Sequence, residues 1–595
     1  MGGYLGVDLF FVLSGFLITS LLLVESDREG GVGLGGFWAR RARRLLPALF
    51  GLMVGVAVYC VVFARPTELE AIRRDGLATL FYVANWRDVF ARQDYWALFD
   101  APSPLQHTWS LAIEEQFYLV WPLVFVGLLA WWKRAAPKAV LVVCLLGAIA
   151  SALLMAVLYD PANVSRVYYG TDTRVSAILL GGALAAALVI WGPVRGRLAR
   201  LALEAAGIAG IAVLAFAWTR VSGQSPGLYR GGLFVCGLAV VAVIAAAAHP
   251  EAGPVSRVLS WRPLCILGLI SYGVYLWHWP VYVVLDPVRT GMTGWALVGV
   301  RVAATLVIAT ASYLILEQPI RHGALSAPSW RWMAPVVAVG IVVIVVGSTI
   351  GGEPAVTASA AKPDSVEQAL RAASAAPTNA RRVLVVGNSV GYFIGRGMQQ
   401  LPEKPPVVTL DRAKIACVFP GGASLVRYKS EDPGTTAGLF TCDDTWKSDV
   451  ARFRPDTVFL VAQCCAPEYR YGGKWLDACD KRYAAMYERR LGKAIRTLGS
   501  TGARVIVTTT PYTSFDYLAP GNRRTIDCTN RLRRTLAPKF GASVVDLFHW
   551  TCPEPPRCRS EDHGVILRSD GVHFRDEAAR IVSRWLLAQA DRLKS

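Results

Sequence analysis

Residues 2–20 read GGYLGVDLFFVLSGFLITS, an apolar run that opens on a glycine pair and carries one charged residue, Asp8. A helix of about 20 such residues is long enough to cross the roughly 30 Å of hydrocarbon in a bilayer. A carboxylate inside such a span is costly and usually functional. Asp8 lies near one end of the run, so a solvated helix end is the alternative. The stretch predicts a membrane helix with a candidate functional carboxylate.

Comparable apolar stretches recur up to about residue 350 and then stop. The protein has 595 residues, of which 54% are hydrophobic, which is too long and too apolar for one soluble domain. We predict a membrane domain over 1–350, a linker rich in Ala, Ser, Pro and Thr over 351–380, and a separate domain over 381–595. The ten spans expected in the membrane domain are 4–24, 45–63, 117–132, 139–158, 176–191, 201–218, 230–248, 264–285, 296–316 and 333–350.

Basic residues mark alternate loops between these spans. The first such loop holds five arginines, and later ones hold Lys133 and Arg134 or Arg195 and Arg197. The positive-inside rule places these loops in the cytoplasm, so residue 1 and the domain after residue 350 lie outside. The net charge of +19 belongs partly to these loops, and no nucleic-acid recognition motif accompanies it. We expect no nucleic-acid partner, whereas a basic outer domain favours an anionic envelope polymer or lipid headgroups.

Cysteine usage gives an independent indication of topology. Four cysteines lie singly in apolar spans, where a small buried hydrophobic residue is the simplest interpretation. The other eight all follow residue 381, as expected for disulfides in an oxidising compartment. A zinc site is the competing interpretation, but no CxxC spacing or paired histidine supports it, so we predict no metal. Spacing does not decide the connectivity, although the adjacent Cys464 and Cys465 are expected to bond to different partners.

Four stretches after residue 381 have the character of strands: RVLVVG, DTVFLVAQ, ARVIVTTTP and SVVDLF. Helical patterns cover 480–499 and 575–593. This alternation predicts a parallel sheet flanked by helices, with its chemistry at the carboxyl ends of the strands.

Two polar motifs fall at such ends. The first strand runs into VVGNSVG, which places Ser389 in a turn, and RSDGVHF follows the last strand with Asp570 and His573. A serine nucleophile needs a base, and the imidazole needs an acceptor that sets its tautomer. A simple turn serine is the alternative for Ser389 alone, but the pairing with a late Asp-x-x-His is much rarer.

Residues 381–595 thus resemble the SGNH (GDSL-like) hydrolase family, which implies a flavodoxin-like α/β fold. The resemblance assigns Ser389 as nucleophile, His573 as base and Asp570 as orienting acid. Asn388 stands where the family usually has aspartate, a change expected to be tolerated because that residue is not the nucleophile. The family's oxyanion donors are harder to locate; backbone N–H groups near Ala416 and Cys417, and the side chain of Gln463, are the candidates. Losing one such donor typically costs about 10² to 10³ in rate.

Polar motifs also interrupt the membrane domain. They are HTWSLAIEEQFYLVWP (107–122), YYGTDTR (168–174), ISYGVYLWHWPV (270–281) and EQPIR (317–321), besides RRARR (40–44). Each has an ordinary alternative: aromatic runs form interfacial belts, a histidine among aromatics can be a satisfied polar group, and arginines can simply set topology.

In their order, however, these motifs are similar to those of the acyltransferase-3 family of integral-membrane O-acyltransferases, over roughly 2–325. The resemblance implies that an acyl group, usually acetyl, passes from cytoplasmic acyl-CoA, a co-substrate rather than a bound cofactor, to a hydroxyl of an envelope glycan or lipid-linked sugar. The arginine cluster would hold the CoA phosphates, because guanidinium groups match phosphate oxygens. That cluster is Arg40, Arg41, Arg43 and Arg44. The candidates for the acceptor pocket are Glu114, Glu115, Tyr169, Asp172, Arg174 and His278, and further membrane-site candidates are Asp8, His107 and Glu317.

The resemblance also implies one more helix before the glycine pair, carrying an arginine and the histidine regarded as the catalytic base of the family. We expect that the coding start was placed too late; a truncated protein without that base is the alternative. Two further functions stay open: a membrane-tethered esterase that uses only Ser389, and a non-catalytic lipid or acyl carrier. In every case we expect a multi-pass protein of the bacterial cell membrane.

Overall fold

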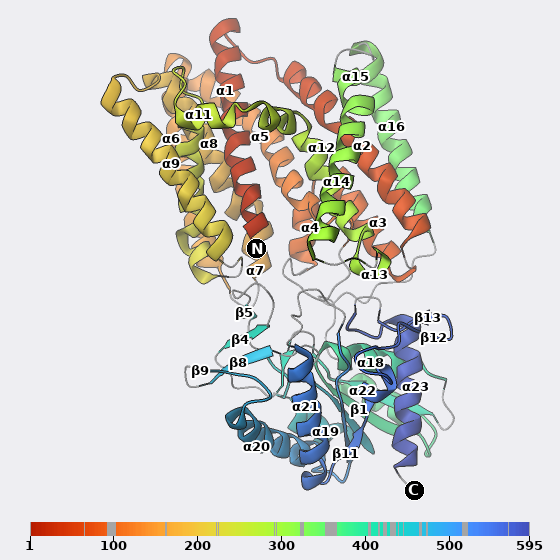
Figure 1. Ribbon diagram of the computed structural model, residues 1–595. Coiled ribbons are helices and arrows are strands. Elements are labelled where there is room, and N and C mark those ends of the chain that lie inside the picture. Colours follow the sequence, from red (N-terminus) through yellow and green to blue (C-terminus); the bar gives the residue numbers. More distant parts are fainter. Residues whose placement is uncertain are drawn as a thin grey trace. The chain divides into compact units, whose positions relative to one another are not determined.

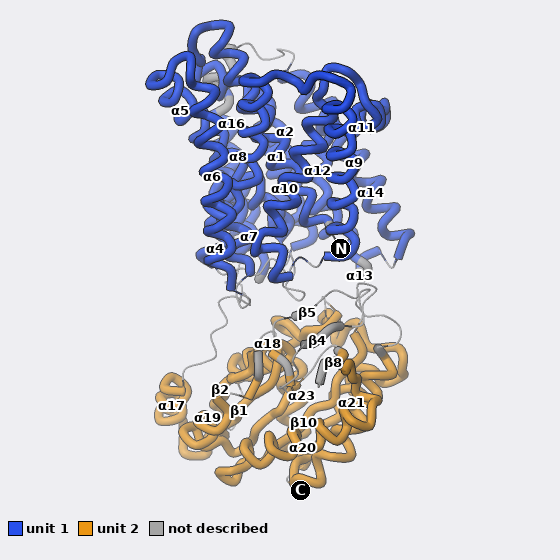
Figure 2. The backbone as a smooth tube through the Cα atoms, turned by 90° about the vertical axis from the view of Figure 1, so that its left-hand side faces the viewer, with its two compact units in different colours: residues 1–97, 102–356 blue, residues 98–101, 357–595 orange. Residues whose placement is uncertain are grey.

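The computed structural model describes residues 2–593 apart from 65, 92–102, 161–163, 222, 224, 291, 293, 322–326, 351–365, 403–405, 415–416, 420–424, 429–435, 438–439, 444, 463–466, 472–473, 514–521 and 569–570. The chain divides into two compact units, residues 1–97 with 102–356 and residues 98–101 with 357–595 (Figure 2). We call them the membrane unit and the outer unit.

The membrane unit is a bundle of helices (Figure 1). Its long helices are apolar around most of their circumference, as helices in contact with lipid must be. They are α1 (Gly6–Glu29), α2 (Leu34–Val62), α5 (Thr108–Trp132), α6 (Ala136–Leu158), α8 (Thr171–Trp191), α9 (Arg197–Arg220), α10 (Leu233–Ala247), α12 (Arg262–Val284), α14 (Gly294–Ser312) and α16 (Ala327–Ser348). Shorter helices join them: α3 (Pro66–Leu80), α4 (Ala84–Phe90), α7 (Val164–Tyr169), α11 (Pro254–Leu259), α13 (Pro287–Thr290), η4 (Tyr313–Glu317) and α15 (Gln318–Arg321).

Each of the ten predicted spans overlaps one of these long helices. Within the described residues, eight helices are long and apolar enough to cross a membrane, and one of them, Thr108–Leu158, has 51 residues. At about 1.5 Å per residue it is more than twice as long as the bilayer core is thick. Lys133, with φ of 43°, interrupts the helical backbone between α5 and α6, so the run contains two of the predicted spans. The tenth, 333–350, coincides with the shorter apolar helix Pro335–Ser348.

A five-stranded parallel sheet forms the centre of the outer unit. Its strands are β1 (Arg381–Gly387), β2 (Val407–Asp411), β7 (Thr457–Val461), β10 (Arg504–Thr508) and β11 (Ser543–Val545). They are ordered β11-β10-β7-β1-β2, the doubly wound order of flavodoxin-like folds. The predicted α/β fold class is confirmed.

Helices cover both faces of this sheet because alternate strand residues point to opposite sides. Leu384, Val458 and Val505 pack with the helices on one face, whereas Val383, Phe459 and Ile506 pack with those on the other. The first face is covered by α17 (Val366–Ala375), α19 (Trp446–Phe453) and α20 (Lys481–Leu498), and the second by α18 (Ser389–Gln399) and α23 (Asp576–Arg592). The unit also contains α21 (Asn522–Leu536), α22 (Leu547–Thr551) and an antiparallel sheet of β5 (Thr436–Ala437), β4 (Leu425–Tyr428), β8 (Pro467–Tyr471) and β9 (Lys474–Leu476).

Six of the eight outer cysteines form disulfides, as predicted. The pairs are Cys417–Cys442, Cys479–Cys528 and Cys552–Cys558; Cys464 and Cys465 lie outside the described residues. A cross-link over 25 or 49 residues restricts the unfolded chain and stabilises the fold by about 3 to 4 kcal/mol in the chain-entropy model. The four cysteines of the membrane unit are free.

Candidate active sites

A tight turn after β1 presents Ser389 at the carboxyl edge of the parallel sheet. Gly387 has φ of 134°, and a Cβ there would lie 1.7 Å from the carbonyl oxygen of Val461 on the neighbouring strand. Only glycine allows this backbone and this close approach. Asn388 then caps α18, because its side-chain oxygen accepts a hydrogen bond of 3.2 Å from the Val390 amide. An asparagine can perform this capping role as well as an aspartate.

His573 reaches the same place from the opposite end of the domain's sequence. Its Nε2 lies 2.8 Å from Ser389 Oγ, and both side chains are buried, with 0% and 2% of their residue surface exposed. The ring of Phe393 lies 5.1 Å from the imidazole ring. A histidine at this distance can accept the hydroxyl proton, so the structure brings together the predicted nucleophile and base.

The other predicted members of this site are only partly described. Asp570, Ala416 and Gln463 lie outside the described residues, so the orienting acid and two oxyanion candidates stay predictions. Cys417 is described: its Sγ, bonded to Cys442, lies 3.2 Å from the carbonyl oxygen of Gly387. This contact places Cys417 beside the strand end that leads to the serine.

A small cavity at this edge of the sheet contains residues that the sequence did not single out. It is lined by residues that end or follow four strands and by two residues of the segment before α23, namely Val390, Val461, Ala462, Thr508, Thr509, Thr510, Pro511, Thr513, Leu547, Arg568 and Val572. Because Val390 and Val572 directly follow Ser389 and precede His573, the cavity adjoins the serine–histidine pair. The TTTP run at the end of the strand-like stretch ARVIVTTTP was the signal that could have identified its threonines.

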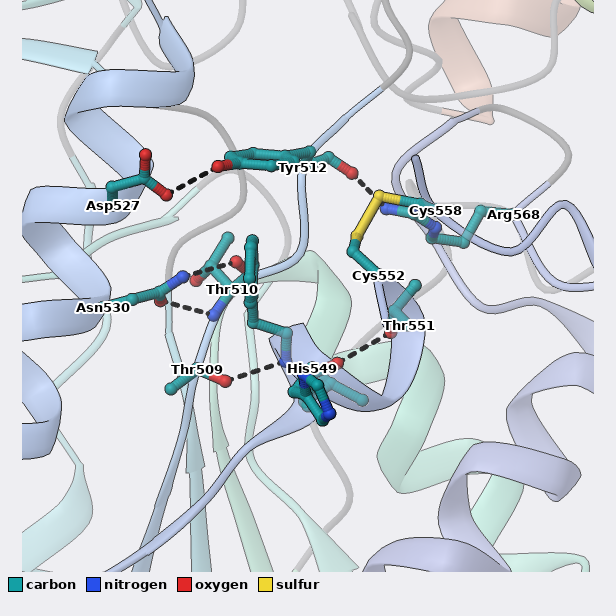
Figure 3. Close-up of a disulfide and its surroundings, with 12 residues drawn as sticks. Thr509, Thr510, Tyr512, Asp527, Asn530, His549, Thr551, Cys552, Cys558 and Arg568 are labelled. Carbon is teal, nitrogen blue, oxygen red and sulfur yellow. Dashed lines mark hydrogen bonds between the residues drawn. A yellow bond between two sulfur atoms is a disulfide. The ribbon is translucent and has the colours of Figure 1, made fainter. Parts of the chain in front are cut away.

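Buried polar contacts hold this lining in place. Arg533, with 1% of its surface exposed, donates from Nη1 to Thr508 O and to Thr510 Oγ1, each at 2.8 Å, and from Nη2 to Ala462 O. Figure 3 shows the neighbouring contacts. The side-chain amide of Asn530 donates to the Thr510 carbonyl and accepts from the Thr510 amide. Arg568 donates to the Tyr512 carbonyl beside the Cys552–Cys558 disulfide. No local sequence pattern pointed to Arg533.

Asp546 anchors the same region from the start of α22. Its carboxylate accepts hydrogen bonds from Thr509 Oγ1 at 2.7 Å, from Arg534 Nη2 at 2.9 Å and from the His549 amide at 3.1 Å. Partial burial works to raise the pKa of Asp546, but the hydrogen bonds from Thr509 and Arg534 outweigh it and the pKa lies below its ordinary value.

We expect this carboxylate to stabilise the outer unit in a pH-dependent way. The folded-state pKa is depressed, so the stabilisation is fully present above the unfolded pKa of about 3.9 and is lost as the pH falls through the folded pKa. Asp546→Asn should lower the free energy of unfolding by about 1 kcal/mol at pH 7, given the half-exposed site, and by much less near pH 3. Denaturant unfolding of both proteins at the two pH values checks this. A stability difference that stays constant down to pH 3 would contradict it.

In the membrane unit, the aspartate of the opening stretch is buried and paired. Asp8 is 3% exposed, and its Oδ2 lies 3.1 Å from Nη2 of Arg174 on α8, itself 1% exposed. The guanidinium also lies over the rings of Tyr168, at 4.9 Å, and Trp109, at 5.8 Å. The interpretation of Asp8 as a solvated helix end is therefore wrong, because α8 and α5 cover that end of α1.

A second polar cluster joins α1, α2 and α5. Ser14 Oγ donates to Glu114 Oε1 at 2.7 Å and lies 2.6 Å from Tyr118 OH, which itself donates to the same carboxylate. The Arg41 guanidinium lies 4.8 Å from the centre of the Tyr118 ring. Arg41, which belongs to the RRARR motif (40–44), thus contacts the part of α5 that carries Glu114, inside the bundle.

The remaining candidates are distributed over both ends of the bundle. Arg40 pairs with Glu25 at 2.8 Å and Asp172 with Arg166 at 2.7 Å, whereas the rings of His107 and His278 lie 5.3 Å apart. Asp172 also lines a cavity with Gln116, Trp121 and Leu179. The others are placed singly: Tyr169 and Glu317 are buried, Arg43 and Glu115 are half-buried and Arg44 is exposed.

Among the described residues no three His, Cys, Asp or Glu side chains gather in a way that could hold a metal ion.

Comparisons with known proteins agree with this two-part structure. A family model described as "Acyltransferase domain" matches residues 1–350, and one described as "SGNH domain (fused to AT3 domains)" matches residues 358–587. The chain is 42% identical over 328 residues to "Peptidoglycan O-acetyltransferase OatA" of Listeria monocytogenes, which covers 54% of this chain and 51% of that protein. It is 39% identical over 327 residues to "O-acetyltransferase OatA" of Staphylococcus aureus, covering 54% and 53%. The chain thus spans about half the length of these relatives. It belongs to the acyltransferase-3 family, in the form that is fused to an SGNH domain.

Proposed function

We propose that the protein O-acylates a glycan outside the cytoplasmic membrane, with acyl-CoA as donor and acetyl as the acyl group. The observation that carries the proposal is the 2.8 Å contact between Ser389 Oγ and His573 Nε2, in a chain whose first 350 residues match the acyltransferase model. Peptidoglycan or its lipid-linked precursor is the proposed acceptor, since the Listeria relative is named for peptidoglycan.

The serine–histidine pair supplies a complete transfer cycle. His573 Nε2 takes the Ser389 proton as Oγ attacks the acyl carbonyl carbon, and the leaving group departs with that proton. The acceptor hydroxyl then gives its proton to Nε2 and attacks the acyl-serine, which restores the serine hydroxyl. Burial of both side chains favours transfer over hydrolysis, because it limits the access of competing water.

The membrane unit would supply the acyl group. The proposed phosphate site is the arginine cluster at the start of α2, where Arg44 is exposed and Arg40 is held by Glu25. Arg41 extends from that cluster to Tyr118 and the Glu114 carboxylate. The polar side chains of Arg41, Tyr118 and Glu114 would lower the free-energy cost of moving a polar acyl group across the bundle.

A vesicle experiment tests the proposal. Membrane vesicles with the cytoplasmic face outward and muropeptides inside receive acetyl-CoA labelled in the acetyl group. We expect alkali-labile label on the enclosed glycan. Release of free acetate from a pre-acetylated glycan, with no transfer from acetyl-CoA, would support the esterase alternative. Movement of labelled precursor across the vesicle membrane that persists after loss of Ser389 and of the arginine cluster would support the carrier alternative.

A further inference from the structure

Two histidines meet at the end of the membrane unit opposite the arginine cluster. His107 directly precedes α5, and His278 lies six residues before the end of α12, about 9 Å from it. The two rings lie edge to face, with centroids 5.3 Å apart. Because α1 and α5 both start at this end, it is the outer side by the positive-inside rule.

The hydrogen bond of His278 determines its neutral tautomer. Nδ1 lies 2.6 Å from the carbonyl oxygen of Tyr275, one turn earlier in α12. A carbonyl oxygen can only accept, so Nδ1 carries the hydrogen and the lone pair of the neutral ring is on Nε2. The side chain is half-buried, which leaves this lone pair within reach of a bound group.

His107 is the unusual member of the pair. It is 7% exposed, and neither ring nitrogen makes a hydrogen bond of normal geometry among the described residues, although the Leu276 backbone lies close to the ring. Buried polar atoms without partners are rare and call for an explanation. In either neutral tautomer one nitrogen donates and the other accepts, so His107 can hold an oxygen that binds beside His278.

The surroundings keep both rings in place. Tyr275 OH donates to the His107 carbonyl at 2.7 Å and hydrogen-bonds the Ser110 hydroxyl, which joins α12 to the start of α5. The ring of Phe10 on α1 stacks on Tyr275 with centroids 6.2 Å apart. Three helices thus build a fixed frame, the condition for an ordered reaction site.

We propose that His107 and His278 form an acceptor-activating site, at which an aliphatic hydroxyl receives the acyl group at the outer end of the membrane unit. The hydroxyl proton moves to His278 Nε2 as the oxygen attacks the carbonyl carbon of an acyl thioester or ester. The donor's C–S or C–O bond breaks, and the leaving thiolate or alkoxide takes the proton back from Nε2. His107 hydrogen-bonds the acyl or acceptor oxygen. This assignment rests on the proposed function.

The test uses the full chain in vesicles with labelled acetyl-CoA, and two variants. His278→Asn keeps an amide that can donate to the Tyr275 carbonyl but lacks the base, whereas His278→Ala leaves room for added imidazole. We expect each to lower acetyl transfer by about 10² to 10⁴-fold, the usual contribution of a general base, and imidazole to restore part of the activity of His278→Ala. The half-buried His249, in the loop after α10, provides the control, His249→Asn, which should transfer normally.

The outcomes separate this assignment from the proposed function. Hydrolysis of p-nitrophenyl acetate by the outer unit should be unchanged in both variants. If the original chain transfers acetyl and His278→Asn stays within threefold of it, or imidazole restores nothing to an inactive His278→Ala, the assignment is overturned and the proposed function stands. If the original chain transfers no acetyl, the proposed function itself fails. Mass spectrometry identifies the acceptor: acetyl on a protein hydroxyl indicates a covalent intermediate, and acetyl on sugar in a Ser389→Ala chain indicates direct transfer.

Discussion

Ser389→Ala should lower acyl transfer to the glycan by about four orders of magnitude or more. The substitution removes the only atom that could form the acyl-serine, and loss of a catalytic serine in comparable triads costs about 10⁴ to 10⁶ in turnover. His573→Gln should have a similar effect, and the double variant little more, because the two side chains act as one unit through their 2.8 Å contact. Labelled-acetate transfer in vesicles measures all three.

A matched serine shows whether the effect is specific. Ser448 lies on α19, where its exposed hydroxyl only donates to the Thr445 carbonyl, and Ser448→Ala should transfer acetyl at the original rate. Melting temperatures of the purified variants show whether each one is folded. Transfer by a folded Ser389→Ala protein within tenfold of the original would refute the role of the outer unit in catalysis.

Breaking the ion pair between Asp8 and Arg174 should have the largest effect on stability. The two side chains are 4% and 0% exposed, so removing either one leaves the other charge buried without a partner. Such a loss typically costs about 3 to 5 kcal/mol. Arg174→Met also loses the contacts of the guanidinium with the rings of Tyr168 and Trp109. We therefore expect Arg174→Met to unfold in detergent at a much lower temperature than the original protein.

A double-mutant cycle distinguishes pairing from simple loss of packing. Asp8→Asn combined with Arg174→Met should be less destabilised than the sum of the two single changes. The pair Arg166–Asp172 joins the same part of α8 to α7 but is 26% and 31% exposed, and breaking it should cost only about 1 kcal/mol or less. Strictly additive effects for Asp8 and Arg174 would contradict the paired model.

Local pattern predicted those features that depend on residues close in sequence. The stretch VVGNSVG combines a buried strand, a glycine turn and a helix start, so the position of Ser389 could be inferred, and the apolar run of α1 is equally self-contained. β2 was missed because its VVTLD is short and ends on a charge, and the antiparallel sheet was missed because strands such as PEYRY are rich in charged residues.

Apart from Ser389 and His573, which two recognisable motifs connect, partnerships between distant residues could not be predicted in this way. Ser14 and Glu114 are 100 residues apart, and Arg533 reaches Ala462 across 71. No periodicity links such positions; only the packing of whole helices and strands brings them together. Disulfide pairing was open for the same reason. The acid of the proposed triad, Asp570, lies outside the described residues and stays a prediction.

The pair of Asp8 with Arg174 also bears on how the protein is made. The two residues are 166 positions apart, and at about 5 to 20 residues per second the ribosome adds the arginine roughly 10 to 30 s after the aspartate. For that interval α1 carries, in its first turn, a carboxylate whose partner has not yet been synthesised, and an unpaired charge within a membrane helix is costly to insert. Biogenesis therefore cannot complete helix by helix: α1 reaches its final place only when α8 arrives beside it.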